Sequence, residues 1–369
     1  MELTNLFTPF DHKGLALQNR IVMSSLTRSR TENAALAPTE LHAEYYAQRA
    51  SAGLIITESA WVSQDAMGYI NIPGIYTQEQ INGWKNVTEA VHMNGGKIFL
   101  QLAHSGSVSH SDFFNGKLPK GPSEINPQEK SFTPNGFKDT ETPEELSLAD
   151  IRKIVSDYRS AAENAFKAGF DGIEIHAQLS TLIPQFLSKA TNQRKDLYGG
   201  DIENRSKILF EILAAVSQVW GEGRVGLKFT PAAYNPGIIR PDSETLNDYG
   251  YLMQRLNEHR LAYLHIVGPA RDLSDTPLAE IGSDYFGFFR THFNGILMVN
   301  LGFDQKSANE ILASGKADLV SFGTLFIANP DLPERFINGW PLALSNPATY
   351  YTGGKKGYTD YPKFQFYQE

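Results

Sequence analysis

The 369-residue chain contains no cysteine, which excludes a disulfide framework, a thiolate nucleophile and a zinc–thiolate site. No run approaches the roughly 20 apolar residues that cross a bilayer, and Met1-Glu-Leu-Thr-Asn5 lacks the features of a secretory signal. The formal charge is −8, and no basic cluster is present, which argues against nucleic acid or anionic membranes as partners. We therefore expect a soluble cytoplasmic protein, a monomer or homodimer, whose partner is a small molecule.

The composition is that of an ordinary globular protein, with 41% hydrophobic and 20% charged residues. Short apolar runs alternate with helical patterns along the chain. Few polar residues interrupt these runs, as expected for parallel strands covered on both faces. We predict eight strands, at residues 21–23, 54–57, 98–102, 172–175, 225–229, 263–267, 296–299 and 319–322.

Helix signals lie between these runs. Thr77-x-x-Gln80 is typical of a capping box that opens a helix. Apolar residues at helical spacing across 151–166 predict a second helix. Asp304 is expected to begin a third, which Gly315 ends in a left-handed conformation.

Eight such repeats fit either a closed barrel or a doubly wound open sheet. An open dinucleotide-binding sheet calls for G-x-G-x-x-G after a strand, and the sequence has no such match. We therefore predict an α/β fold, a (β/α)8 TIM barrel that forms one domain over residues 1–369.

Residues 103–147 interrupt the alternation after the third strand. They are rich in Ser, Pro, Gly, Asn and Lys, with several phenylalanines between them. Loops of this length in compact domains are usually functional lids or disordered. This one follows a strand at the barrel face where active sites lie, so we predict a lid or small hairpin subdomain that caps the barrel.

Barrel active sites lie at the carboxyl ends of the strands. Here those positions are mostly polar, with Glu58 as the one carboxylate, which disfavours a glycosidase. His104 and His176 have no carboxylate cluster beside them in the sequence, so no metal site is expected. The set suits an anionic or electron-rich planar group. Its members are Ser24, Ser25, Thr27, Glu58, Ser59, Gln101, His104, His176, Gln178, Thr181, Lys228, Gly268, Leu301, Gly302, Gly323 and Thr324.

Motifs from Leu6 to Pro362 surround these positions. They are Leu6-Phe7-x-Pro9, Asn19-Arg20-Ile21-Val22-Met23, Leu26-Thr27-Arg28-Ser29-Arg30, Gly68-Tyr69, Pro73-Gly74-Ile75, Gln101-Leu102-x-His104-x-Gly106, Gln185-Phe186-Leu187-Ser188, Asn192-x-Arg194-x-Asp196-x-Tyr198-Gly199-Gly200, Glu203-Asn204-Arg205, Ala317-Asp318-Leu319-Val320-x-Phe322-Gly323, Ala328-Asn329-Pro330-Asp331-Leu332 and Gly357-Tyr358-Thr359-Asp360-Tyr361-Pro362. Together they resemble the old yellow enzyme family; a single piece such as Asn329-Pro-Asp-Leu would be weak evidence.

The resemblance implies an FMN-dependent ene-reductase, in which hydride passes from NADPH or NADH through the flavin to an α,β-unsaturated carbonyl. It implies catalytic roles for His176, Thr181 and Lys228, with His176 binding the carbonyl oxygen. Tyr69, His176, Leu179 and Tyr351 would contact the substrate. The implied FMN-binding residues are Ser25, Thr27, Ser59, Gln101, Lys228, Leu301, Gly302, Gly323 and Thr324.

The substrate motif of the family, His-x-x-(His/Asn)-x-Tyr, is altered in this chain. It reads His176-Ala-Gln-Leu179-Ser-Thr181. Leu179 replaces the second carbonyl donor, and Thr181 replaces the tyrosine that protonates the α-carbon. An aliphatic hydroxyl is a far weaker acid than a phenol, whose pKa is about 10, so Thr181 is a poor substitute.

Flavin positions are altered as well. Lys228 replaces an arginine near the ring, so the charge is kept but the planar fork is lost. Thr324 replaces the arginine that clamps the phosphate, which should weaken FMN unless Lys355 or Lys356 reaches inward.

Two further changes, Ala103 for the usual tryptophan and Ser107 for the usual arginine, should enlarge or reshape the pocket mouth. Because several functional positions differ together, two alternatives stay open. One is a flavin-poor barrel acting as a non-redox isomerase or cyclase on a carbonyl, and the other is an inactive binding protein.

Overall fold

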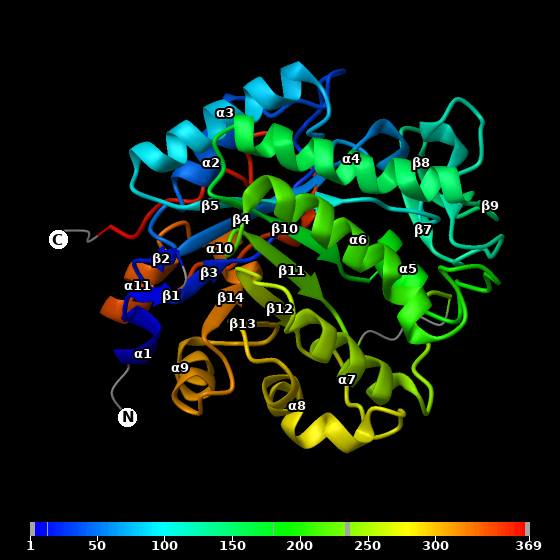
Figure 1. Ribbon diagram of the computed structural model, residues 1–369. Coiled ribbons are helices and arrows are strands. Elements are labelled where there is room, and N and C mark those ends of the chain that lie inside the picture. Colours follow the sequence, from blue (N-terminus) through cyan, green and yellow to red (C-terminus); the bar gives the residue numbers. More distant parts are fainter. Residues whose placement is uncertain (1–3, 13, 180, 233–236, 366–369) are drawn as a thin grey trace.

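The computed structural model describes residues 4–12, 14–179, 181–232 and 237–365. Eight parallel strands close into a barrel at its centre, which confirms the predicted fold (Figure 1). In order around the barrel they are β3 (Ile21–Met23), β4 (Leu54–Trp61), β5 (Ile98–Ala103), β10 (Gly172–Ala177), β11 (Val225–Phe229), β12 (Tyr263–Val267), β13 (Leu297–Asn300) and β14 (Leu319–Phe322).

Helices surround the barrel, as Figure 1 shows. The α-helices are α1 (Thr4–Phe7), α2 (Glu40–Ala47), α3 (Gln78–Met93), α4 (Leu148–Lys167), α5 (Leu182–Leu187), α6 (Ile202–Trp220), α7 (Thr245–Leu256), α8 (Tyr285–His292), α9 (Gln305–Ala313), α10 (Thr324–Ala328) and α11 (Leu332–Asn338). Short 3-10 helices are η1 (Gln64–Ala66), η2 (Ser111–Phe113), η3 (Ala279–Asp284) and η4 (Pro347–Thr349).

The three predicted helices form where their signals lie. Thr77 caps α3 and accepts a hydrogen bond from the backbone N–H of Gln80. The apolar residues of 151–166 lie on α4, where the residues facing the barrel are buried. Asp304 caps α9, and Gly315 follows it with a φ of 71°, the left-handed conformation expected of it.

Four of the barrel strands extend beyond their predicted ends, β5 and β13 by one residue each and β4 and β10 by more. β4 continues to Trp61 through an irregularity in its pairing with β5 between Ile56 and Ser59, and β10 continues to Ala177. A bulge of this kind redirects side chains at the end of a strand. As a result, Ser59 and His176 lie within strands, not in the loops that follow them.

The segment after the third barrel strand forms two small sheets outside the barrel. In one, β7 (Lys130–Thr133) pairs with β8 (Gly136–Asp139) as an antiparallel hairpin; in the other, β6 (Lys120–Gly121) pairs with β9 (Glu144–Glu145). The rings of Phe132 and Phe137 stack at 4.3 Å on this hairpin, and the ring of Tyr69 packs edge-on against Phe132. The hairpin insertion is therefore as predicted, and aromatic contacts attach it to a residue predicted to contact the substrate.

A second hairpin closes the other end of the barrel. Strands β1 (Phe10–His12) and β2 (Leu15–Leu17) bring Phe10, Leu15 and Leu17 onto buried residues of the barrel strands, such as Phe99 and Met298. This packing fills the amino-terminal end, so the carboxyl ends of the strands are left for a binding site. No helix among the described residues is long and apolar enough to cross a membrane.

Candidate functional site

A cavity of about 940 Å³ lies at the carboxyl ends of the barrel strands. All of the residues predicted to bind cofactor or substrate line it, although they come from the whole length of the chain. They are Ser25, Thr27, Ser59, Tyr69, Gln101, His176, Leu179, Thr181, Lys228, Leu301, Gly302, Gly323, Thr324 and Tyr351. The structure thus brings the predicted site residues together around one space.

Three residues expected at this face lie outside the cavity. The carboxylate of Glu58 turns back to accept the backbone N–H groups of Arg28 and Ser29, and burial raises the pKa of Glu58 to about 7. His104 accepts the N–H of Gly106 at Nδ1 and lines a separate cavity of about 530 Å³. Gly268 donates to the backbone of the neighbouring strand β13. These three residues make backbone contacts and do not line the cavity, so Glu58 has the structural role expected of a strand-end carboxylate and His104 supports its loop.

The polar floor of the cavity rests on a buried carboxylate. Glu174 lies on β10, with no exposed surface, and accepts hydrogen bonds from Nδ1 of His265 at 2.9 Å and from Nε2 of Gln101 at 2.7 Å. Burial alone would raise the pKa of Glu174, but its hydrogen bonds and the nearby charge of Lys228 keep this pKa below its ordinary value. Glu174 is therefore an ionised acceptor at neutral pH.

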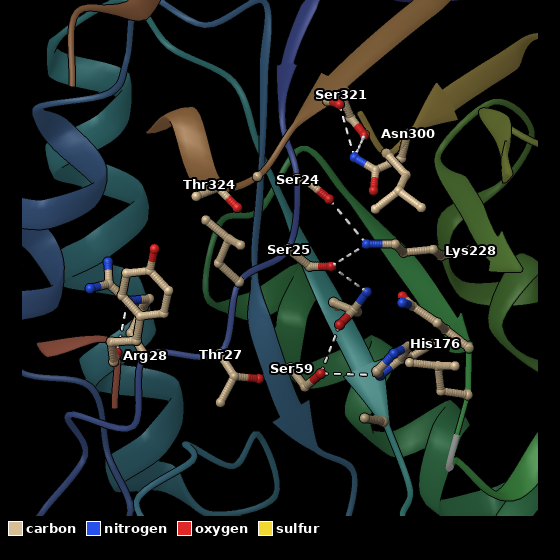
Figure 2. Close-up of a pocket in the computed structure, with 18 of the residues that line it drawn as sticks. Ser24, Ser25, Thr27, Arg28, Ser59, His176, Lys228, Asn300, Ser321 and Thr324 are labelled. Atoms are coloured by element: carbon tan, nitrogen blue, oxygen red, sulfur yellow. Dashed lines mark hydrogen bonds between the residues drawn. The ribbon is translucent and has the colours of Figure 1, made fainter. Parts of the chain in front are cut away.

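This carboxylate fixes the direction of the neighbouring hydrogen bonds. Because a carboxylate only accepts, Gln101 turns its amide nitrogen toward Glu174 and its oxygen toward Ser59. Ser59 then donates its one hydroxyl hydrogen to Gln101, at 2.7 Å. The contact of 3.2 Å between Ser59 Oγ and His176 Nδ1 must consequently be donated by the imidazole (Figure 2).

His176 is neutral in this setting. Burial, followed by the positive charge of Lys228, lowers the pKa of His176 to about 3. A neutral imidazole carries one hydrogen, and here Nδ1 holds it, so Nε2 is left as a hydrogen-bond acceptor. The orientation of His176 is thus set by Ser59, Gln101 and Glu174.

Lys228 supplies a buried positive charge at the centre of the site. Its Nζ donates to Ser24 Oγ at 3.0 Å and to Ser25 Oγ at 2.9 Å (Figure 2). Burial lowers the pKa of Lys228, while the charge of Glu174 opposes that shift. An ammonium has three N–H donors, so one N–H remains for a bound anionic or electron-rich group after its two partners among the described residues.

The altered substrate motif forms the turn between β10 and α5. Leu179 adopts a left-handed φ of 46° and is 42% exposed. The hydroxyl of Thr181 donates to the backbone oxygens of His176 at 2.9 Å and Gln178 at 3.1 Å, so its hydrogen is engaged by the turn. Gln178 also lines the cavity at this turn.

The cavity wall is aromatic on one side and small on the other. The rings of Tyr69 and Tyr351 lie 6.2 Å apart at the mouth. Ala103 lines the cavity where a tryptophan would project, which agrees with an enlarged pocket. Ser107 is buried and does not line the cavity, and its N–H donates to Gln185, so its effect on the mouth stays a prediction.

The residues present fit FMN, with one region lacking a cation. A Cβ at Gly302, where φ is 79°, would meet no atom within 4 Å, so a ligand can approach the backbone there. Polar side chains, among them Thr27 and Lys228, line the cavity and offer hydrogen bonds to the edge of a flat ring. Around Gly323 and Thr324, however, the donors are hydroxyl and backbone N–H groups.

The positively charged side chains considered as partners for the phosphate make contacts elsewhere. The guanidinium of Arg28 donates to the backbone oxygens of Tyr350 and Gly357 and extends away from Lys228 in Figure 2. Lys130 pairs with Asp139 at 2.7 Å. Lys355 lies 3.8 Å from Glu44, and neither it nor Lys356 lines the cavity, so the inward reach considered for them is not observed.

Several site residues were missed by the sequence reasoning. Asn300 and Ser321 line the cavity and hydrogen-bond each other, and Ser321 in turn contacts Nε2 of His265. The sequence did carry a signal for Glu174. It lies two residues before His176 on an otherwise apolar strand, so the two side chains point to the same face. No group of three or more His, Asp or Glu suited to a metal ion occurs among the described residues.

Comparisons with known proteins agree with this geometry. The profile of the NADH:flavin oxidoreductase / NADH oxidase family matches residues 5–343. The flavin oxidoreductase hxnT of Emericella nidulans is 38% identical, with 98% of each chain covered. The 12-oxophytodienoate reductase 1 of Oryza sativa subsp. japonica is 39% identical, with 97% of this chain and 92% of that protein covered.

Solved structures show the same barrel. Morphinone reductase superposes with a TM-score of 0.92 at 42% identity, covering 98% of this chain and 97% of that one. A structure of morphinone reductase in complex with tetrahydroNAD gives a TM-score of 0.91 at 42% identity, with 98% of each chain covered. The old yellow enzyme homologue from Zymomonas mobilis gives a TM-score of 0.91 at 37% identity, covering 98% of this chain and all of that one.

Proposed function

The chain belongs to the NADH:flavin oxidoreductase / NADH oxidase family as an enzyme of the old yellow enzyme type, and we propose that it is an FMN-dependent ene-reductase for α,β-unsaturated carbonyl compounds. The observation that carries the proposal is the single cavity lined by Thr27, Gln101, His176 and Lys228. The flavin-poor isomerase or cyclase finds no support among the relatives described above.

We propose that the floor of the cavity holds the flavin ring. Gln101 and the free N–H of Lys228 would bind its pyrimidine edge, with Thr27 and Ser25 beside it. The phosphate would lie against the backbone of Leu301, Gly302, Gly323 and Thr324. When bound, FMN supplies the group that accepts hydride from the nicotinamide and delivers it to the β-carbon of the alkene.

The chain's own residues would orient the substrate above that ring. The oxygen-binding region is formed by the turn at His176, and Tyr69 and Tyr351 would enclose the alkene. Because the hydroxyl hydrogen of Thr181 is engaged by the backbone, we infer that water protonates the α-carbon. Such a site would reduce enones more slowly than one with a phenolic acid in place.

Residues 103–147, which include the hairpin of β7 and β8, would act as a lid over the cavity. Glu129 and Lys130 line the cavity, and Phe132 packs on Tyr69, so the hairpin covers one side of the mouth. We infer that NADH serves as a reductant, since a relative of 42% identity has been solved with tetrahydroNAD. A cytoplasmic location would supply that reductant.

A spectroscopic experiment tests the proposal. The purified protein, reconstituted with FMN, should be yellow, should bleach under anaerobic NADH, and should recover its colour when 2-cyclohexenone is added. Parallel titrations with NADH and NADPH would rank the two reductants. A colourless protein that cannot be reconstituted with FMN would refute the proposal.

A further inference from the structure

A second cavity lies where the long insertion meets the start of α4. Its volume is about 530 Å³, and it has no lining residue in common with the main cavity. Its walls come from η1, the residue after β5, the insertion and the first turns of α4. Small-molecule sites commonly have this size, with apolar walls and a few placed polar groups.

His104 faces this second cavity. Its neighbours Ala103 and Ser105 both line the main cavity, whereas His104 itself lines the second one. This alternation is that of an extended chain, in which successive side chains point to opposite sides. The imidazole of His104, which is only 3% exposed, is therefore turned away from the flavin site that we propose.

The hydrogen bonds of His104 leave one donor without a partner. Nδ1 accepts the N–H of Gly106 at 2.9 Å, so it carries no hydrogen. Burial lowers the pKa of His104 to about 4, so the ring is neutral at pH 7 and its one hydrogen lies on Nε2. No group among the described residues accepts that hydrogen, and Nε2 is not one of the fully enclosed polar atoms that lack a partner. It thus keeps surface toward the cavity, where a ligand oxygen would satisfy it.

The charged residues of this cavity are largely paired with one another. Lys153 lies 3.2 Å from Asp65 and 2.8 Å from Asp157, and Lys120 lies 2.8 Å from Asp150. The lining holds four carboxylates and three lysines, so it has no excess of positive charge to attract an anion. A neutral imidazole N–H in turn offers nothing to a cation. The set therefore favours a neutral ligand.

The kind of oxygen follows from the same pairs. A ketone oxygen only accepts, whereas an alcohol also brings a hydrogen that needs an acceptor. Three of the four carboxylates are already paired with lysines, which favours the ketone. Phe114, Leu118, Leu146 and Ile154 supply apolar surface for the rest of such a molecule.

We propose that this cavity is a second binding site, for a neutral cyclic ketone whose oxygen accepts the Nε2 hydrogen of His104 while its ring packs against Phe114, Leu118 and Ile154. The site is separate from the main cavity, so this inference does not depend on the proposed function.

Nuclear magnetic resonance of protein labelled with ¹⁵N-histidine, with FMN added, tests the proposal. The probe is cyclohexanone, and the Nε2 resonance of His104 reports the second cavity while His176 reports the main one. His104→Asn assigns the resonance, since the asparagine oxygen can keep the bond to the N–H of Gly106. Leu118→Trp fills the second cavity, and Leu344→Trp, at a leucine that is 92% exposed and lines neither cavity, is the matched control.

Cyclohexanone should move the Nε2 resonance of His104 in a saturable way. The Kd read from this resonance should weaken at least tenfold in Leu118→Trp and stay unchanged in Leu344→Trp. Cyclohexanecarboxylate, which has the same ring with a negative charge, should bind at least tenfold more weakly than the ketone.

A His104 resonance that stays unmoved up to the solubility limit of cyclohexanone would overturn the proposal, as would equal Kd values in Leu118→Trp and the wild type. Binding of the carboxylate as tightly as the ketone would overturn the assignment of a neutral ligand. Failure of the proposed function would appear instead as absent flavin absorbance or absent enone reduction, which leaves the His104 titration readable.

Discussion

Ser59 Oγ lies 3.2 Å from Nδ1 of His176 and accepts its hydrogen, because the hydroxyl hydrogen of Ser59 is already given to Gln101. A serine hydroxyl on β4 thus determines which nitrogen of a histidine on β10 is protonated. The ultimate source of that direction is the buried carboxylate of Glu174, which can only accept.

The tautomer of His176 can be measured directly. In protein labelled with ¹⁵N-histidine at pH 7, the nitrogen shifts of His176 should show hydrogen on Nδ1 and an unprotonated Nε2. Ser59→Ala should shift the population toward the other tautomer, since the acceptor at Nδ1 is gone. Hydrogen on Nε2 in the wild type would contradict the direction derived from Glu174.

Glu174→Gln should destabilise the fold strongly. The substitution removes the carboxylate that accepts from both His265 and Gln101 in a fully buried setting. Breaking a buried pair in this way costs about 3–5 kcal/mol in free energy of unfolding, measured by urea denaturation. Glu163→Gln, at the exposed pair with Arg159, should cost about 0–1 kcal/mol. Equal effects of the two variants would show that the buried network adds no stability.

Thr324→Arg should tighten FMN binding. The phosphate region has neutral donors, and a guanidinium there would add a charge-assisted, bidentate contact. We expect the Kd for FMN, measured by quenching of flavin fluorescence, to fall about tenfold or more. Ala313→Arg adds the same charge at the exposed end of α9 and should leave this Kd unchanged. Equal Kd values in Thr324→Arg and the wild type would place the phosphate elsewhere.

Thr181→Tyr should speed enone reduction. It supplies a phenol where the present hydroxyl is engaged by the backbone oxygens of His176 and Gln178. A positioned acid accelerates proton transfer by about 10²–10⁴, so turnover of 2-cyclohexenone should rise at least tenfold. The kinetic solvent isotope effect should change at the same time. Flavin-loaded variant protein with unchanged turnover would show that Thr181 does not face the α-carbon.

Mild acid should destabilise the protein through buried histidines. Burial lowers the pKa of His42 and of His104 to about 4, whereas both titrate near 6.5 in an unfolded chain. Between these values the unfolded chain binds more protons, so the free energy of unfolding falls as the pH drops from 6.5 toward 4. Each group contributes about 1.4 kcal/mol per pH unit in this window.

Urea denaturation at pH 7, 6 and 5 measures that slope. His42→Gln, which keeps a polar side chain beside Thr31 and Thr39, should give a shallower dependence on pH than the wild type. The same slope in both proteins would mean that His42 is already charged in the fold.

The barrel was predictable because its strands are buried on both faces. Residues 225–229, 263–267 and 319–322 form strands at the bounds that their apolar runs predict. The ends of the strands that carry Ser59 and His176 could not be predicted in the same way. The bulge of β4 and the extension of β10 depend on pairing between strands, which no local pattern specifies.

The identity of the site residues could be predicted from the sequence, but the hydrogen bonds that join them could not. Their positions at strand ends and the family motifs placed Thr27, Gln101, His176 and Lys228 around one cavity. The network beneath them was missed, because Glu174 and His265 lie inside strands and their pairing joins residues 91 positions apart. His104 could not be excluded from sequence, since its neighbours along the chain are those of the site.

The hairpin of β1 and β2 bears on how ligands reach the site. Phe10, Leu15 and Leu17 pack against buried residues of the barrel strands at the end opposite the cavity. We therefore expect ligands to reach and leave Lys228 through the cavity at the carboxyl ends of the strands. An electron donor and an electron acceptor would then bind in turn at the same site. The acceptor can bind only after the oxidised donor has left, so release of the oxidised donor limits the rate at which the acceptor binds.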